Sequence, residues 1–154
     1  MIGRVVVLGS VVMAVGCTPA RIATLEPPPE AERSEVLVYR GSAFNAGGMT
    51  AIFGADRNDY LKLGTDTYAE LQLVPKTYEF FVRTNEADRP YRLTIELKQN
   101  DRRCLEAFPN PKNLMKVPLF FVGYWLGNTF LLKEVDCPNS EVLASYVQVA
   151  PEYE

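Results

Sequence analysis

Apolar and polar residues alternate with a period of two along much of the chain. The clearest stretch runs from Tyr91 to Lys98, where Leu93, Ile95 and Leu97 alternate with charged or hydroxyl side chains. A period of two is that of a β-strand with one face in the core and the other in water. Other strand-like runs lie at residues 36–39, 51–53, 60–63, 69–73 and 78–82. The pattern therefore predicts a series of short strands.

The joints between these runs are short. Residues 55–59 form a polar turn and Pro75–Lys76 separates two further runs, so we expect successive hairpins. One short helix is expected near the end, with Ser140 as its N-cap and residues 141–146 as its body. Many short strands with few helix signals are typical of a sandwich or small barrel. The fold predicted for residues 35–154 is all-β, a small antiparallel β-sandwich with one short C-terminal helix.

A strongly apolar arm, residues 119–126, precedes a predicted turn at Gly127–Asn128, and residues 129–135 follow the turn as the next strand. The arm is apolar apart from a glycine and a tyrosine hydroxyl. A run this apolar is normally covered on both faces, so a core strand is the ordinary interpretation. The functional alternative is an exposed contact surface, since aromatic residues are enriched at interfaces and membrane surfaces. The candidate partner or ligand contacts are Phe120, Phe121, Tyr124 and Trp125.

The first residues have the pattern of an export signal. Arg4 and the amino terminus supply positive charge, residues 5–14 are mainly apolar, and small residues precede Cys17. The apolar stretch is shorter than the roughly 20 residues that a membrane-spanning helix needs. Bacterial lipoprotein signals end in Leu, small, small, Cys, which residues 14–17 resemble with alanine in the first position. We expect residues 1–16 to be a signal peptide and Cys17 to carry a lipid. The alternatives are an ordinary signal cut at the same place and a buried first strand.

The cysteine count supports lipidation. The chain has Cys17, Cys104 and Cys137, and an odd cysteine in an exported protein calls for an explanation. A lipid on Cys17 leaves the other two as a pair. Their disulfide would close a loop of about 34 residues and stabilise the fold by roughly 4 kcal/mol on the chain-entropy model. An exported setting favours the disulfide over two buried thiols.

Residues 17–34 are expected to be a linker between the lipid and the domain. They contain Pro27, Pro28 and Pro29, which favour an extended and semi-stiff chain that holds the domain off the bilayer. The residue after Cys17 is threonine rather than aspartate. In a Gram-negative cell, the sorting pattern of lipoproteins then implies the outer membrane, with the domain facing the periplasm.

Composition limits the chemistry. Hydrophobic residues make up 47% and charged residues 23%, and the net charge of −3 has the wrong sign for a nucleic-acid binder. The absence of histidine excludes Ser–His and Cys–His catalysis and disfavours the common zinc sites. The acidic turn Asp56, Asn58 and Asp59 lacks the spacing and glycine of a calcium loop, and Arg102–Arg103 is best explained as a solvated strand end. We predict no metal, cofactor or catalytic residue.

Five segments have a pattern in common with known proteins: residues 36–40, the small-residue loop 42–48, the strand pair around Asp56, residues 64–75 and residues 130–135. Together they resemble a family of small bacterial lipoproteins that share a domain of unknown function, similar in style to PEGA-type β-domains. The family usually has Pro-Gly where this chain has Pro75–Lys76. The resemblance implies a β-sandwich on a lipid anchor and carries over no catalytic residue.

The leading hypothesis is a lipid-anchored protein of the cell envelope, held in the membrane by its N-terminal lipid. It would act as a non-catalytic structural or protein-interaction module, with an exposed strand edge or aromatic patch recruiting an envelope protein. The second hypothesis is a carrier whose apolar arm lines a pocket for a lipid or another hydrophobic small molecule. A hydrolase that uses carboxylates is the third and has no positive support.

Overall fold

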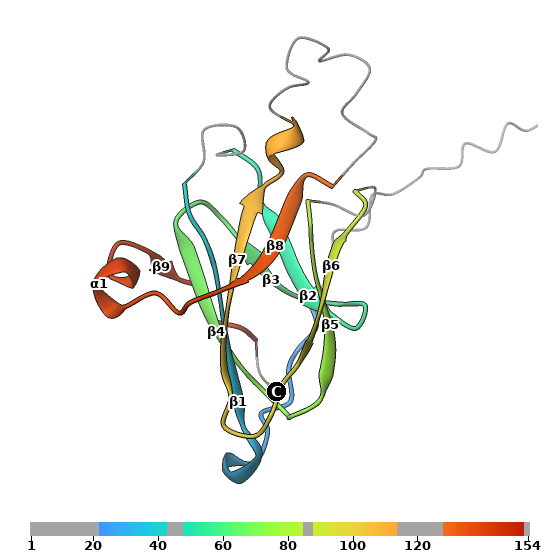
Figure 1. The fold of residues 1–154 in the computed structure, drawn as a ribbon, viewed down its shortest axis with the longest axis vertical. Coiled ribbons are helices and arrows are strands. Elements are labelled where there is room, and N and C mark those ends of the chain that lie inside the picture. Colours follow the sequence, from blue (N-terminus) through green and yellow to red (C-terminus); the bar gives the residue numbers. More distant parts are fainter. Residues whose placement is uncertain (1–21, 43–47, 85–87, 114–127, 153–154) are drawn as a thin grey trace, which may run out of the picture.

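The computed structural model of the chain describes residues 22–42, 48–84, 88–113 and 128–152. Its strands form two sheets that pack face to face, which confirms the predicted all-β sandwich (Figure 1). The elements are the 3-10 turn η1 (Glu30–Glu32), β1 (Ser34–Arg40), β2 (Ala51–Ala55), β3 (Asn58–Leu63), β4 (Thr67–Leu73), β5 (Thr77–Arg83), β6 (Tyr91–Glu96), β7 (Arg102–Pro109), β8 (Phe130–Val135), α1 (Ser140–Leu143) and β9 (Val147–Gln148).

One sheet has the strand order β8-β7-β1-β4-β9 and the other the order β3-β2-β5-β6. Most pairs are antiparallel, but β1–β7 and β4–β9 are parallel. The turn at Pro75–Lys76 is where the sequence predicts it, yet β4 and β5 do not form the expected hairpin. The turn instead carries the chain from the five-stranded sheet to the four-stranded one. Each of the two strands has one apolar face, and because they lie in different sheets these faces both point into the core between the sheets.

The β2–β3 hairpin forms as predicted. Its two central residues, Asp56 and Arg57, have φ values of 50° and 79°, as a two-residue type I′ turn requires. At a register shift between Phe53 and Gly54, Tyr60 is left as an extra residue on β3, so the bulge lies on that strand. A Cβ on Gly54 would lie 2.0 Å from the Asn58 carbonyl oxygen, so this close approach needs glycine.

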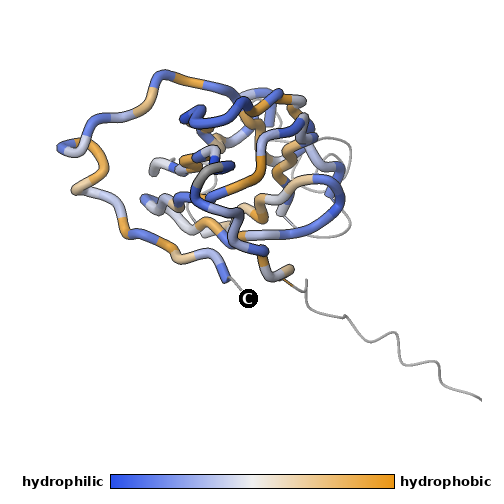
Figure 2. The backbone as a smooth tube through the Cα atoms, turned by 90° about the horizontal axis from the view of Figure 1, so that it is seen from below, coloured by the Kyte–Doolittle hydropathy of each residue, from blue (hydrophilic) through white to orange (hydrophobic). Residues whose placement is uncertain are grey.

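Alternate residues of the strands meet in one core between the sheets. Phe80 stacks on Phe53 and on Tyr78, with ring centroids 5.6 and 5.3 Å apart. In β6 and just after it, Ile95 and Leu97 are buried, as their alternation with polar residues predicts. Figure 2 shows this alternation along the tube as short hydrophobic stretches between hydrophilic ones.

A buried arginine closes one end of this core. Arg40 is fully buried at the end of β1, and its guanidinium lies 4.6 Å from the centre of the Phe130 ring. It donates hydrogen bonds to the carbonyl oxygens of Met49 and Leu63. Burial lowers the pKa of Arg40, and nearby Asp66 partly opposes the shift. The guanidinium thus joins β1 to the ends of β2 and β3.

The linker differs from the extended spacer expected over residues 17–34. In its described part, Leu25 and Pro28 are buried, and Leu25 donates a backbone hydrogen bond of 2.8 Å to Glu152. Ala23 donates another to Asp59 at the edge strand β3. Residues 22–33 therefore pack on the domain. The Leu25 side chain is removed from water, and backbone groups of the linker pair with those of Glu152 and Asp59.

The C-terminal helix is also shorter than predicted. Asn139, rather than Ser140, is the N-cap: its side chain accepts a hydrogen bond of 2.9 Å from the Val142 amide. The helix ends at Leu143 and the chain continues through a turn into β9. The strand expected after the Gly127–Asn128 turn is β8, and its described partner is β7. The apolar arm, residues 119–126, lies outside the described residues.

Candidate functional site

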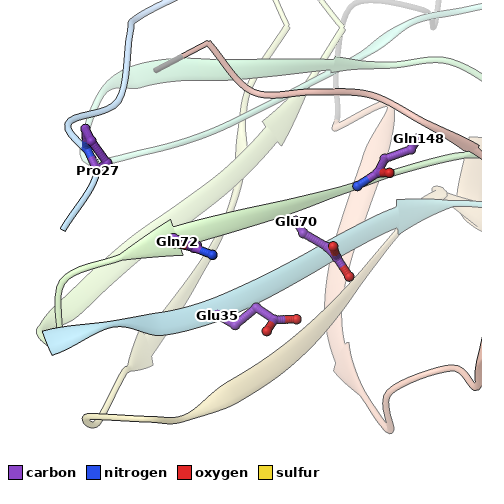
Figure 3. A pocket seen from close by; sticks show the side chains of 5 residues that line it. All are labelled: Pro27, Glu35, Glu70, Gln72 and Gln148. Carbon is purple, nitrogen blue, oxygen red and sulfur yellow. The ribbon is translucent and has the colours of Figure 1, made fainter. Parts of the chain in front are cut away.

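A polar groove on the outer face of the five-stranded sheet is the candidate site. It has a volume of about 420 Å³ and opens to solvent. Figure 3 shows the side chains that line it, which come from the linker, β1, β4 and β9: Pro27, Glu35, Glu70, Gln72 and Gln148.

Strand register brings these distant residues together. Glu35 lies opposite Gln72 in the antiparallel β1–β4 pair and opposite Arg102 in the parallel β1–β7 pair. Arg102, Glu35 and Gln72 thus form one row across three strands. Glu70 lies two residues before Gln72 and points to the same face, while Leu71 between them points into the core.

One arginine sits between the two carboxylates of the groove. Arg102 Nε is 3.0 Å from Glu35 Oε1, and its Nη2 is 3.6 Å from Glu70 Oε1. All three side chains are more than one third exposed, so these ion pairs contribute little to folding stability. Together with the amides of Gln72 and Gln148, they offer hydrogen-bond donors and acceptors, and the carboxylates exceed the guanidinium by one negative charge.

The groove continues toward the turn between β6 and β7. A second hollow of about 230 Å³ shares Glu35 and Gln72 with it and extends to Asn100 and Asp101. Asp101 accepts hydrogen bonds from the Lys98 amide at 3.1 Å and from the Arg103 guanidinium at 3.0 Å. These bonds, the Lys98 bond first, lower the pKa of Asp101, so its carboxylate stays ionised at neutral pH.

Tyrosines lie on the same face beyond the groove. Burial, and then the charge of Glu106, raise the pKa of Tyr39 to about 12, and the Tyr39 hydroxyl is hydrogen-bonded to Glu106. Glu106 also pairs with Lys133 at 2.9 Å. The ring of Tyr146 meets that of Tyr39 edge-on, with centroids 5.8 Å apart. A tyrosine with a raised pKa is a poor base or nucleophile at neutral pH, so this cluster suits packing rather than proton transfer.

The disulfide is the predicted site feature that the structure confirms. Cys104 and Cys137 are bonded, with their Cα atoms 5.1 Å apart. Cys17 and the four aromatic contact candidates, Phe120, Phe121, Tyr124 and Trp125, lie outside the described residues.

The polar residues weighed as alternative sites are engaged in separate contacts. Asp56 pairs with Lys76 at 2.9 Å, while Asp59 pairs with Arg83 at 2.6 Å, so the two carboxylates of the turn face different cations. Arg103, next to the groove's Arg102, pairs with Asp101 and with Glu134 on β8. Within the ranges that the structure describes, no group of three or more metal-ligating side chains occurs.

Nothing in the sequence pattern marks the groove. Its polar residues alternate with core residues along β1 and β4, as on any solvated strand face, so they carry no signal of their own. What joins them is the β4–β1–β7 order and its register. The proline run predicts a stiff chain, but Pro27 lines the groove because the linker packs against the domain.

Comparisons with protein-family models, with curated proteins and with solved structures find no match for this chain. The resemblance to small bacterial lipoproteins therefore stays a prediction. Among the described residues, no helix is long and apolar enough to cross a membrane.

Proposed function

We propose that the chain is a lipid-anchored protein of the cell envelope whose β-sandwich holds a polar segment of a partner protein in its outer-face groove, without catalysing a reaction. The anchor fixes the location, and the groove provides the contact surface. The observation that carries the proposal is the pairing of Cys104 with Cys137, which accounts for both cysteines of the domain and leaves Cys17 as the third.

Two features support the anchor. The disulfide suits an oxidising compartment, in agreement with the export signal at the amino terminus. Cys17 directly follows small residues at the predicted cleavage site, where a lipoprotein carries its lipid. Neither feature depends on the other.

The groove supports a protein contact rather than a small hydrophobic ligand. Its lining consists of two carboxylates, two amides and Pro27, and Arg102 pairs with both carboxylates from the adjoining hollow. Such side chains bind a partner through hydrogen bonds, as at the polar rim of protein interfaces. A carrier for lipids would instead need a concave and mostly apolar pocket.

The anchor is tested by the intact mass of the protein made with its own leader. We expect a chain that begins at Cys17, carries acyl groups and gains two hydrogens on reduction. A mass that begins at Cys17 without acyl groups, or one that includes residues 1–16, would contradict the anchor.

The groove is tested by photo-crosslinking in cells, with a photoreactive residue at Gln72 or at Thr94. Both positions are exposed strand residues, but Thr94 lies on β6 of the other sheet. We expect a discrete protein adduct from Gln72 that is absent at Thr94. That adduct should disappear when Glu35 and Glu70 are changed to Lys in the crosslinking chain. Equal adducts at both positions, or none at Gln72, would contradict the proposal that the groove binds a partner protein.

A further inference from the structure

The C-terminal segment, residues 136–152, forms a strap on the outside of the five-stranded sheet. After β8 the chain passes across β7 toward α1 and then turns back along β4 as β9 (Figure 1). In Figure 2 the tube that ends at the C-terminus makes a wide loop beside the body of the domain. The strap thus connects one edge of the sheet to the other.

The non-covalent contacts of the strap are few. The helix α1 has no buried residue, and β9 pairs with β4 through only two residues. Val147 donates a backbone hydrogen bond to Asp66 and Val149 donates one to Tyr68. The edge-on contact of Tyr146 with Tyr39 adds a small apolar interface.

The disulfide sets the direction in which the chain leaves β8. Cys104 lies opposite Val135 in the β7–β8 register, and Cys137 follows two residues later. The core residues Leu105 and Ala107 point inward, so Cys104 points to the outer face. A bond from Cys104 to Cys137 therefore draws the first part of the strap onto that face, where an unbonded chain could continue past the edge.

The outer face also has an apolar residue that needs a cover. Leu37 is fully buried, but it alternates with Val36 and Val38 of the core and so points the other way. Its neighbour across the β1–β7 pair is Cys104, which is 1% exposed. The disulfide attaches the first part of the strap to this neighbour.

We propose that the Cys104–Cys137 disulfide is a latch, and that its reduction releases the strap while the sandwich stays folded. This inference does not rest on the proposed function. The reductant is a dithiol: one thiolate attacks the sulfur of exposed Cys137, and Cys104 leaves as a thiolate that takes up a proton. The second thiol of the dithiol then displaces Cys137, so the dithiol becomes a disulfide and both cysteines become thiols.

The sandwich does not depend on the strap for its core. The buried core cluster of the described residues extends from Leu25 to Leu132, and Val149 is the strap's partly buried contribution to it. Release would affect two other regions. Gln148 would leave the wall of the groove, and Glu152 would leave its hydrogen bond with Leu25 of the linker.

Hydrogen exchange of the full chain, measured by mass spectrometry with and without dithiothreitol, tests the latch. We expect the amides of Val147 and Val149 to exchange at least roughly tenfold faster after reduction, because local opening sets their rates. Amides in the ladder between β1 and β4 should keep their protection. The C137S variant should show the fast pattern without reductant and should not respond to it.

Two outcomes would overturn the latch. If Val147 and Val149 keep their protection both after reduction and in C137S, the strap is held by its other contacts. If the β1–β4 amides lose protection together with them, the disulfide supports the whole domain rather than the strap. An N139A variant, which removes the α1 cap but keeps the disulfide, serves as the control and should leave the Val147 and Val149 amides protected.

Discussion

Gly54 shows how tightly single residues fit in this domain. An added Cβ would lie 2.0 Å from the Asn58 carbonyl oxygen and 2.6 Å from a ring atom of Phe81. Backbone atoms cannot yield as a flexible side chain does, so G54A should lower the free energy of unfolding by about 3 kcal/mol. Denaturant unfolding measures the loss. G48A is the matched control, since a Cβ there meets nothing within 4 Å, and an equal effect of both changes would refute the crowding at Gly54.

Arg40 joins the end of β1 to Leu63 of β3 and to Met49, which lies just before β2, through a buried charge. In R40M the aliphatic length remains, but the carbonyl oxygens of Met49 and Leu63 lose their donor. The cost of leaving these carbonyl oxygens unpaired is larger than the desolvation cost that is avoided when no charge is buried. We therefore expect the free energy of unfolding to fall by about 2 kcal/mol. K62M, at an exposed position of β3, should change the value little. A variant R40M as stable as the original chain would mean that the guanidinium adds nothing to the fold.

Tyr39 and Tyr78 should titrate later than a tyrosine with an ordinary pKa. Burial chiefly raises the pKa of each to about 12. A folded-state pKa above the ordinary value of about 10 gives stability that is complete below pH 10 and is lost as pH rises toward 12. The ultraviolet absorbance of tyrosinate should show a late step that Y39F reduces. E106Q should move part of that step to lower pH, and a late step unchanged by Y39F would contradict the assignment.

At the scale of elements, the sequence pattern predicts those strands and pairings that depend only on segments close together in the sequence. The β2–β3 hairpin follows from two alternating runs and a polar turn, and the alternation in β6 places Ile95 and Leu97 in the core. The crossing from β4 to β5 and the parallel β1–β7 pair were beyond such reasoning, because strand partners are chosen by long-range packing. The groove is subject to the same limit: Glu35, Glu70 and Arg102 meet only through the order and register of three strands.

The linker is an element whose role the sequence pattern missed. Leu25, which belongs to the buried core, lies in a stretch that the prolines predict to be extended. L25S should lower the unfolding free energy by about 2 kcal/mol and free residues 22–33, since it removes buried apolar surface. Tryptic cleavage after Arg33 should then become faster. E26S changes the exposed neighbour and should leave cleavage unchanged, whereas slow cleavage in L25S would show that other contacts hold the linker.

For the whole molecule, the ionisable groups predict how stability depends on pH. The chain has no histidine, so no side chain has an ordinary pKa between pH 5 and 8, and stability should be flat there. Below that range two aspartates matter. Hydrogen bonds from the Lys98 amide and Arg103 lower the pKa of Asp101. Burial raises the pKa of Asp56, but hydrogen bonds from Lys76 and the Glu79 amide outweigh it and leave that pKa lowered.

A lowered folded-state pKa gives stability that is complete above the ordinary aspartate value of about 4 and is lost as pH falls through the folded value. Denaturant unfolding at a series of pH values should therefore show a plateau that declines below about pH 4. D101N and D56N should each begin from a lower plateau and decline less steeply, because each removes one group that binds more protons when unfolded. If both variants keep the original slope, other carboxylates govern acid unfolding. A decline of the unfolding free energy between pH 5 and 8 would contradict the predicted plateau.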